Sequence, residues 1–305
     1  MASNSFYRPE QVGDWGAPVA ASGASYAEDA LQLADGTEIF FRTWQAADPG
    51  APALVLLHGL GAHTGWFIDM GNQLNAAGLS VYMDDHRGFG RSGGPRGHVR
   101  RGSIFLDDLS RWLDEIQKRQ PNAPLFLLGH SMGGIFATYL AADDARSGRG
   151  RVKGVVFVNP WVKEIIKTPL GAVLTGVPAG LLGSQKLFPL PPNPAVMTAN
   201  PDAVRLLNED RYWVSQQSKA FLVQLLRLRQ GILRQARDVR APALVLQSEE
   251  DRSVSKQHTR RLYEALASAD KTWKTYPGFA HDFEFEPERS LLDADLADWI
   301  LRHRA

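Results

Sequence analysis

Five short stretches of this 305-residue chain are apolar at almost every position rather than at alternate positions. Continuous runs of this kind are typical of strands that helices cover on both faces, as in a parallel sheet. A strand with one face in water would alternate apolar and polar residues instead. The runs lie at 54–57, 79–83, 125–128, 155–158 and 243–246. They predict a mostly parallel central sheet.

Helical patterns lie between and after these runs. One stripe has apolar residues at i, i+4, i+7, i+8 and i+11, the spacing of one helix face: Phe105, Leu109, Trp112, Leu113 and Ile116. Residues 262–266 and 292–300 carry similar stripes. Alternating strands and helices indicate an α/β fold, with helices flanking the sheet.

This alternation stops between residues 161 and 238, where apolar segments are punctuated by proline. The stretch 187–194 cannot continue a helix, because proline lacks the N–H and clashes with the preceding turn. A helical stretch follows at 221–228. We expect 161–238 to be an inserted helical cap over one end of the sheet. Residues 28–160 and 239–305 then form the core, and 1–27 form an irregular N-terminal arm.

Composition excludes several classes of function. The chain has 34 Lys+Arg against 33 Asp+Glu, whereas a nucleic-acid-binding domain is clearly basic. It has no cysteine, so disulfides, thiolate metal sites and a cysteine nucleophile are excluded. The start lacks a basic stretch followed by an apolar one, and the most apolar window, 169–182, is too short and interrupted to span a bilayer. These features predict a cytoplasmic protein.

A Gly-x-Ser-x-Gly motif occurs at 129–133, between an apolar run and a helical run. The motif alone is a weak signal, but a strand-to-helix turn at this point would hold the hydroxyl of Ser131 out at the end of the sheet. Glycines flank the serine because a Cβ at either position would collide with a tightly turned backbone. Ser131 is therefore the predicted nucleophile.

A serine hydroxyl needs a base to take its proton, and in this architecture the chain order is serine, acid, histidine. His281 follows the probable strand 272–276, and a loop there can bring the imidazole over the serine. His258 lies in an exposed-looking helical stretch, and His303 lies near the last residue. We therefore predict His281 as the base.

The acid should follow an earlier strand. The run 243–246 is followed by three carboxylates, those of Glu249, Glu250 and Asp251. The four-residue offset of Asp251 suits a turn that returns an acid towards the histidine. Asp251 is the predicted acid, and Glu249 or Glu250 remains the alternative. The acid would fix the histidine tautomer and stabilise the imidazolium.

Two N–H donors are needed for the negative oxygen of the tetrahedral intermediate. Met132 follows the nucleophile, and Leu60 lies in a glycine-rich loop after the run 54–57, so these two residues are predicted to form the oxyanion hole. We interpret His58 as a residue that shapes this loop by hydrogen bonding. No metal site is expected, because His58 and His63 lack the spacing and acidic partner of a zinc motif.

Taken together, these motifs resemble those of α/β-hydrolases of the monoacylglycerol lipase and lysophospholipase group. The resemblance rests on Asp251, His281 and four segments: 58–61 (His-Gly-Leu-Gly), 85–92 (Asp-His-Arg-Gly-Phe-Gly-Arg-Ser), 94–97 (Gly-Pro-Arg-Gly) and 128–134 (Leu-Gly-His-Ser-Met-Gly-Gly). It runs from about residue 28 to 303 and is weakest in 161–238. It implies the triad Ser131–Asp251–His281, the oxyanion hole of Leu60 and Met132, and a cap over an acyl-binding pocket.

The chain departs from the family pattern after the oxyanion loop. Family members commonly carry a glutamate and then an Arg-Tyr pair, where this chain has Ala62 and then Trp66 and Phe67. The change leaves the mechanism intact but places an aromatic pair where it would line a different pocket. Trp66 and Phe67 are thus the predicted substrate-binding residues.

The predicted function is a serine esterase or lipase that acts on acyl esters, monoacylglycerol-like or lysophospholipid-like, through an acyl-enzyme. No cofactor is needed, because fixed backbone dipoles stabilise the charge. The apolar cap favours medium or long acyl chains, and a transient contact with a membrane surface through 169–190 is a weaker expectation. The alternatives are another hydrolase with a serine triad (a peptidase or a C–C bond hydrolase) and a non-catalytic ligand receptor on the same fold.

Overall fold

The apolar runs pair side by side in the computed structural model, which describes residues 26–165, 184–189 and 194–304. Within these residues an eight-stranded sheet has the order β1-β2-β4-β3-β5-β6-β9-β10. Its strands are β1 (Ala27–Gln32), β2 (Glu38–Trp44), β3 (Ala53–Leu57), β4 (Ser80–Asp84), β5 (Leu125–His130), β6 (Val152–Val158), β9 (Ala243–Ser248) and β10 (Lys271–Tyr276). From β4 to β10 neighbouring strands are parallel, whereas β2 is antiparallel to both β1 and β4. The predicted α/β fold with a mostly parallel sheet is confirmed.

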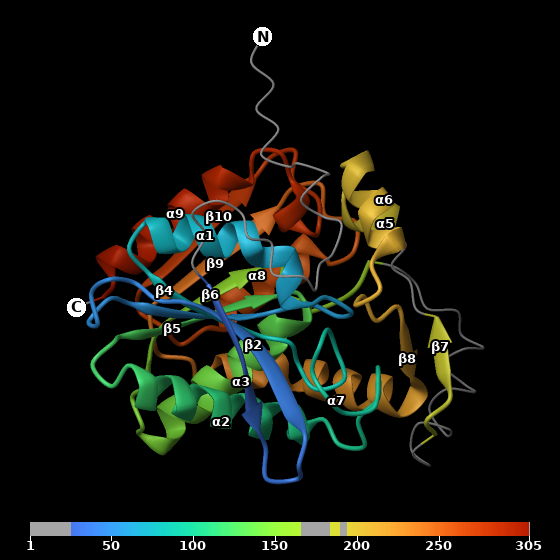
Figure 1. Ribbon diagram of the computed structural model, residues 1–305. Coiled ribbons are helices and arrows are strands. Elements are labelled where there is room, and N and C mark those ends of the chain that lie inside the picture. Colours follow the sequence, from blue (N-terminus) through green and yellow to red (C-terminus); the bar gives the residue numbers. More distant parts are fainter. Residues whose placement is uncertain (1–25, 166–183, 190–193, 305) are drawn as a thin grey trace.

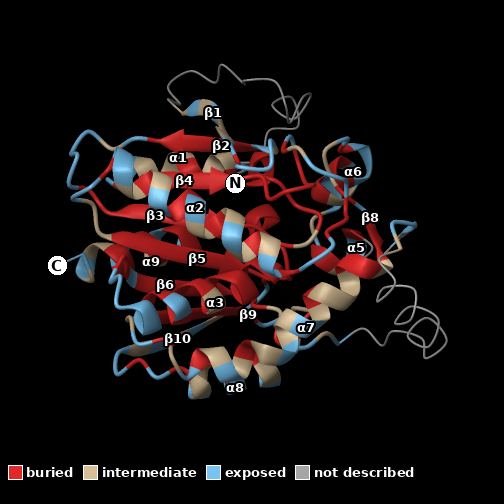
Figure 2. Cartoon of the chain, turned by 90° about the horizontal axis from the view of Figure 1, so that it is seen from below, coloured by how far each residue is buried: buried red, intermediate tan, exposed pale blue. Residues whose placement is uncertain are grey.

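The continuous apolar runs have a direct structural reason, which strand β3 illustrates. Side chains alternate between the two faces of a strand, so Leu54 and Leu56 join one hydrophobic core while Val55 and Leu57 join the other. All four are buried, because helices cover both faces of the sheet (Figure 2). A polar side chain at any of these positions would therefore be buried without water to bond, whichever face of the sheet it points to.

Two helical layers cover the sheet (Figure 1). Helices α1 (Ile68–Ala76) and α9 (Arg289–Arg302) contact one another on one face, while α2 (Ser103–Arg119) and α3 (Met132–Ser147) lie on the other. The stripe predicted at 105–116 is the set of α2 residues that is buried. The stripes near 262 and 292 also fall on helices, α8 (Lys256–Ala265) and α9.

The first two strands were not expected. Strand β1 begins at Ala27 and has no fully buried residue, so its sequence carries no apolar signal. It is an edge strand, paired only with β2 in the described part of the sheet. Residues 1–25 of the predicted N-terminal arm lie outside the described residues.

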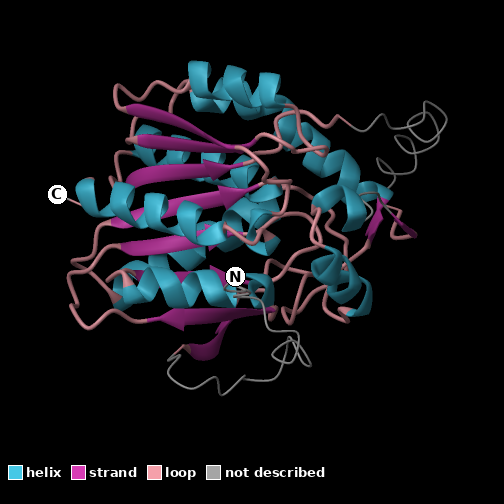
Figure 3. Ribbon diagram, turned by 90° about the horizontal axis from the view of Figure 1, so that it is seen from above, coloured by secondary structure: helices cyan, strands magenta, loops and turns pink. Residues whose placement is uncertain are grey.

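The segment between β6 and β9 leaves the main sheet (Figure 3). Its described elements are β7 (Leu187–Pro189), α5 (Pro194–Met197), α6 (Pro201–Glu209), β8 (Gln216–Ser218) and α7 (Lys219–Ala236). Among the described residues, strands β7 and β8 pair only with each other, and α7 packs against α3 and α8. The window 169–182 and the prolines at 191 and 192 lie outside the described residues. No helix in the described ranges is long and apolar enough to cross a bilayer.

The packing on α2 leads to a prediction about stability. Trp112 is 1% exposed, and its ring centroid lies 4.3 Å from that of Phe41. Trp112→Ala should lower the free energy of unfolding by about 3–5 kcal/mol, because it removes apolar contacts and leaves a cavity. Leu291→Ala is the matched control, since Leu291 is 56% exposed, and it should change that free energy by less than about 0.5 kcal/mol. Urea denaturation measures both, and equal losses would contradict this description of the core.

Candidate active site

Ser131 lies at a sharp turn between β5 and α3. Its φ of 50° and ψ of −112° are unusual for a residue with a side chain. The turn is crowded: a Cβ added to Gly129 would lie 2.5 Å from the Gly133 oxygen, and one added to Gly133 would lie 1.9 Å from the oxygen of Leu57. The glycines of the motif therefore let the backbone turn where any larger residue would clash.

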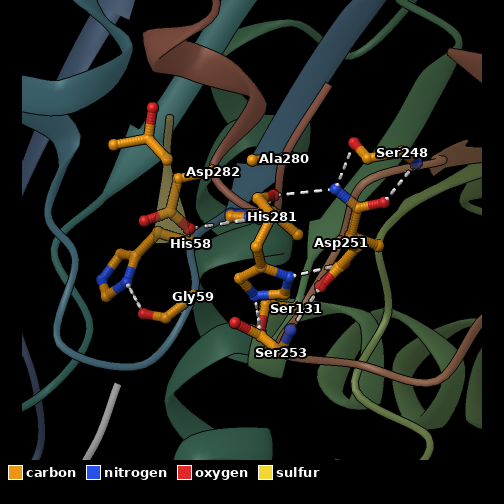
Figure 4. Close-up of polar contacts among 12 residues, drawn as sticks. His58, Gly59, Ser131, Ser248, Asp251, Ser253, Ala280, His281 and Asp282 are labelled. Carbon is orange, nitrogen blue, oxygen red and sulfur yellow. Dashed lines mark hydrogen bonds and ion pairs between the residues drawn. The ribbon is translucent and has the colours of Figure 1, made fainter. Parts of the chain in front are cut away.

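The structure brings Ser131, His281 and Asp251 together at the carboxyl end of the sheet (Figure 4). His281 Nε2 lies 3.0 Å from Ser131 Oγ, and His281 Nδ1 lies 2.8 Å from Asp251 Oδ2. The three residues follow the ends of β5, β9 and β10. Because these strands are parallel, their carboxyl ends share one edge of the sheet, and loops from distant parts of the chain meet there.

The alternative acids and bases are engaged elsewhere. Glu249 is exposed and pairs with Lys256 at 2.6 Å, and Glu250 is also exposed. Among the histidines, the ring of His258 bonds the Ser255 hydroxyl, and His303 Nε2 lies 3.1 Å from Asp270. Of the candidates considered from the sequence, only Asp251 and His281 contact each other within the described residues.

The Asp251 carboxylate is held by its own loop. Its Oδ1 accepts hydrogen bonds from the Ser253 and Val254 N–H groups at 2.7 and 3.0 Å, which leaves Oδ2 for the histidine. The chain leaving β6 pairs with this loop: the Ile165 N–H donates to the oxygen of Ser253 at 2.9 Å. The Asp251 carboxylate is thus held by its own loop, and that loop is held by the chain that leaves β6.

The environment of His281 sets its basicity. The residue is 4% exposed, and burial alone would lower its pKa by disfavouring the imidazolium. The charge and hydrogen bond of Asp251 outweigh burial and raise the pKa of His281 above its ordinary value. The ring is consequently a stronger base than a free histidine, as proton abstraction from a serine requires.

The predicted oxyanion loop lies directly beside the serine. A Cβ added to Gly59 would lie 3.3 Å from the Cβ of Ser131. Within the described part of the chain, the N–H groups of Leu60 and Met132 donate no hydrogen bond. Met132 is also the first residue of α3, and the N-terminus of a helix favours negative charge. Both groups are therefore available to an oxygen near Ser131.

His58 shapes this loop, as the sequence predicts. The His86 N–H donates to His58 Nε2 at 3.0 Å, so the ring proton is on Nδ1, which donates to the Gly59 oxygen at 2.7 Å. Full burial, reinforced by the neighbouring His86, lowers the pKa of His58 well below its ordinary value. A neutral ring with both nitrogens occupied is a structural hydrogen bonder.

The segment before α7 contacts the oxyanion loop through Asp210. The Gly65 N–H donates to His63 Nδ1, so His63 Nε2 carries the proton and donates to Asp210 Oδ2 at 2.8 Å. Trp66 Nε1 donates to the same oxygen at 2.8 Å. Burial would raise the pKa of Asp210, but these hydrogen bonds outweigh it and lower the pKa. Further along, the Val214 N–H donates to the oxygen of Gly61 at 3.0 Å.

The aromatic pair after the oxyanion loop is buried. Trp66 is 4% exposed and packs against Phe285 in addition to its bond to Asp210. Phe67 is fully buried beside His130, the residue before the nucleophile, with the ring centroids 6.2 Å apart. Both residues adjoin the site, and their role in binding substrate stays a prediction.

One group of described residues has the spacing of a metal site. The ligand atoms of His130, His281 and Asp282 lie within 4.8 Å of one another. His281 uses both ring nitrogens for Ser131 and Asp251, and His130 Nε2 donates to the His281 oxygen at 3.1 Å. The proximity of these three residues therefore follows from the way the histidine loop is held.

Sequence reasoning missed two residues that support the site. Asn159 bonds the backbone of the histidine loop, and Asp210 bonds the oxyanion loop. The signal for Asn159 was its position directly after a buried strand, next to the strand of the nucleophile. Asp210 gave no signal, because its partners lie 144 and 147 residues away in the sequence.

The sequence is similar to those of known proteins. A family model described as serine aminopeptidase, S33 (Hydrolase_4) matches residues 49–288. The chain belongs to this hydrolase family. It is 30% identical over 275 residues to the monoacylglycerol lipase of Mycolicibacterium smegmatis, which covers 88% of this chain and 94% of that protein. It is 32% identical over 257 residues to the monoglyceride lipase of Homo sapiens, with 82% of each chain covered.

A solved structure agrees with these sequence matches. The crystal structure of the Paleococcus ferrophilus monoacylglycerol lipase superposes with a TM-score of 0.76 at 26% identity, covering 87% of this chain and 99% of that one. The expected resemblance to α/β-hydrolases of the monoacylglycerol lipase group is confirmed. The hydrolase fold places its nucleophile on a strand-to-helix turn, as this structure does.

The raised pKa of His281 predicts the pH dependence of this hydrolase. His281 must be neutral to act as the predicted general base, so kcat/KM should fall as the pH drops through the pKa of His281. Because Asp251 raises that pKa, the midpoint should lie above the ordinary value of 6.5. Initial rates with an uncharged ester between pH 5 and 9 measure the midpoint. A midpoint at or below 6.5 would contradict the described influence of Asp251.

Proposed function

We propose that this hydrolase cleaves acyl esters through a catalytic triad of Ser131, His281 and Asp251. The observation that carries the proposal is the position of His281, whose two ring nitrogens lie at hydrogen-bonding distance from a serine oxygen and a carboxylate. This arrangement activates a hydroxyl for attack on a carbonyl carbon. The comparisons support an ester-hydrolysing serine hydrolase.

The reaction proceeds in two steps. In the first, Ser131 Oγ attacks the ester carbonyl carbon while its proton passes to His281 Nε2. The N–H groups of Leu60 and Met132 hold the oxyanion, and Asp251 stabilises the imidazolium. As the C–O bond breaks, the departing alcohol takes the proton from His281. In the second step, water gives a proton to the same nitrogen as its oxygen attacks the acyl carbon. His281 then returns that proton to Ser131 Oγ as the bond between the serine oxygen and the acyl carbon breaks, which releases the carboxylic acid and restores the enzyme. The proposed chemistry needs no cofactor.

The proposed substrate is an uncharged or zwitterionic acyl ester of the monoacylglycerol or lysophospholipid kind, with an apolar chain. The two relatives named above are lipases for monoacylglycerols, which supports this class. Trp66 and Phe67 replace an Arg-Tyr pair of the family pattern and give the region beside the oxyanion loop an apolar character. The proposal includes a preference for a medium or long acyl chain over an acetyl group, although Trp66 and Phe67 are themselves buried. Transient contact with a membrane surface through 169–190 remains part of the proposal, and Leu187 in this stretch is 38% exposed.

A peptidase is the second candidate, because the matching family is described as serine aminopeptidase. An aminopeptidase must bind a free ammonium group, which calls for an available carboxylate near the serine. Asp210 is saturated by His63, Trp66 and the Tyr212 N–H, and Glu164 pairs with Arg229. These two acids are therefore poor ammonium receptors, which favours the ester.

Replacing the nucleophile tests the proposal. Ser131→Ala should abolish hydrolysis of p-nitrophenyl esters and monoacylglycerols, because among the described residues Ser131 supplies the one hydroxyl bonded to His281 Nε2. Ser131→Ala should also lose labelling by a fluorophosphonate, while its circular dichroism spectrum stays that of the wild type. Measuring amino acid p-nitroanilides alongside distinguishes the two candidates, and faster amide than ester cleavage would favour the peptidase. Ester hydrolysis retained in Ser131→Ala would rule out the triad.

The assignment of the acid has its own test with matched controls. Asp251→Asn should lower kcat on the order of 10⁴-fold, because an amide cannot hold the histidine tautomer or stabilise the imidazolium. Glu249→Gln and Glu250→Gln change the same charge within two residues and should keep kcat within about twofold, since both side chains are exposed. A larger loss in either control than in Asp251→Asn would assign the acid to that glutamate.

A further inference from the structure

Asn159, the residue after β6, has an unusual backbone. Its φ is 45°, and among the described residues it shares a positive φ only with Ser131 and glycines. Asparagine tolerates this conformation better than most residues but still stores strain there. Its side chain is fully buried. Strained, buried polar residues next to a reacting centre are often retained for what they hold in place.

The carboxamide of Asn159 uses all of its hydrogen-bonding capacity. Its Oδ1 accepts from the Ser248 N–H at 2.7 Å and from Gln247 Nε2 at 3.2 Å. Its Nδ2 donates to Ser248 Oγ and to the backbone oxygen of His281, both at 2.8 Å. Because the Ser248 N–H can only donate, the oxygen must face β9, and the amide orientation is fixed. One side chain therefore ties the end of the acid strand to the histidine loop.

The backbone on either side of Asn159 contacts the nucleophile. The Ser131 N–H donates to the oxygen of Val158 at 3.1 Å, and the Trp161 N–H donates to the oxygen of Ser131 at 2.9 Å. Asn159 therefore lies where hydrogen bonds link the end of β5, the end of β9 and the loop that carries His281. Figure 4 labels Ser248 and His281, the two residues to which Asn159 Nδ2 donates.

We propose that Asn159 is a positioning residue, which sets the place of the His281 imidazole through the backbone oxygen of that residue. The inference rests on the proposed triad. His281 lies on a loop, and the donors that fix its carbonyl are Asn159 Nδ2 and, at 3.1 Å, His130 Nε2. Without the Asn159 bond, the backbone oxygen of His281 keeps one side-chain donor, His130 Nε2, and the imidazole moves relative to Ser131 Oγ. Displacement of a reacting group by about 1 Å costs on the order of 100-fold in rate.

The test uses two variants of Asn159 and one control. Asn159→Gly keeps a backbone that accepts the positive φ and removes every side-chain bond. Asn159→Asp keeps the size and the acceptor oxygen towards β9 but replaces the donor that faces His281. Ser248→Ala removes a hydroxyl bonded to the same Nδ2 and leaves the bond to His281 intact. Asn159→Gly loses four buried hydrogen bonds, Asn159→Asp loses the two that Nδ2 donates, and Ser248→Ala loses one. A purely structural role would lower the thermal midpoint of each variant without lowering kcat of the folded protein.

The expected result separates activity from stability. Steady-state kinetics with a p-nitrophenyl ester should show kcat reduced about 100-fold in Asn159→Gly and Asn159→Asp, with KM within twofold of the wild type. Ser248→Ala should keep kcat within threefold, even where its thermal midpoint falls as far as those of the other variants. A folded Asn159→Gly or Asn159→Asp with kcat within threefold, or an equal loss of kcat in Ser248→Ala, overturns the positioning role.

Failure of this inference is distinct from failure of the proposed function. If Ser131→Ala keeps ester hydrolysis, the triad itself is wrong. If Ser131→Ala is inactive and Asn159→Gly is active, the triad stands and Asn159 has a packing role alone. Asn159→Asp keeps the test decisive if the glycine variant does not fold.

Discussion

The hydrogen bond between His281 and Asp251 is the interaction on which the rest of the site depends. It fixes the ring proton on Nδ1, so that Nε2 faces Ser131 with a free lone pair. It also offsets the cost of burying an imidazole that becomes charged in the proposed reaction. For the bond to exist, loops after β9 and β10 must end side by side, which the parallel pairing of these strands ensures. The parallel pairing of β9 and β10 is thus required for the contact between His281 and Asp251.

The loop after His281 shows how the site tolerates further buried acids. Glu284 is 4% exposed, and within the described residues neither of its carboxylate oxygens bonds another residue. Burial raises its pKa to about 8, and burial together with the neighbouring Glu284 raises the pKa of Asp282 well above its ordinary value. Near neutral pH the Glu284 carboxyl therefore tends to hold its proton. Asp251 differs in its contacts, because three donors surround its carboxylate.

Much of the site could be predicted from sequence because its signals are local. Ser131 lies between a strand and a helix, Asp251 and His281 each follow a strand, and parallel strands bring such positions to one edge. Strand β1 could not be predicted, because an edge strand with no buried residue has no apolar pattern. Asn159 and Asp210 could not be predicted either, since an asparagine after a strand or an acid in a polar stretch is also common in ordinary turns. Their roles depend on partners that only the fold brings near.

The contacts of Asp210 connect the segment between β6 and β9 to the residues that follow the predicted oxyanion loop. This carboxylate binds His63 and Trp66, both of which follow the loop that carries Leu60. A backbone N–H stabilises an oxyanion only if it is held in place before the reaction, because reorienting a dipole costs free energy. The segment between β6 and β9 therefore supports the predicted oxyanion loop through Asp210 and Val214. Any displacement of residues 210–214 would also break the bond from the Val214 N–H to the oxygen of Gly61, the residue that follows the predicted donor Leu60.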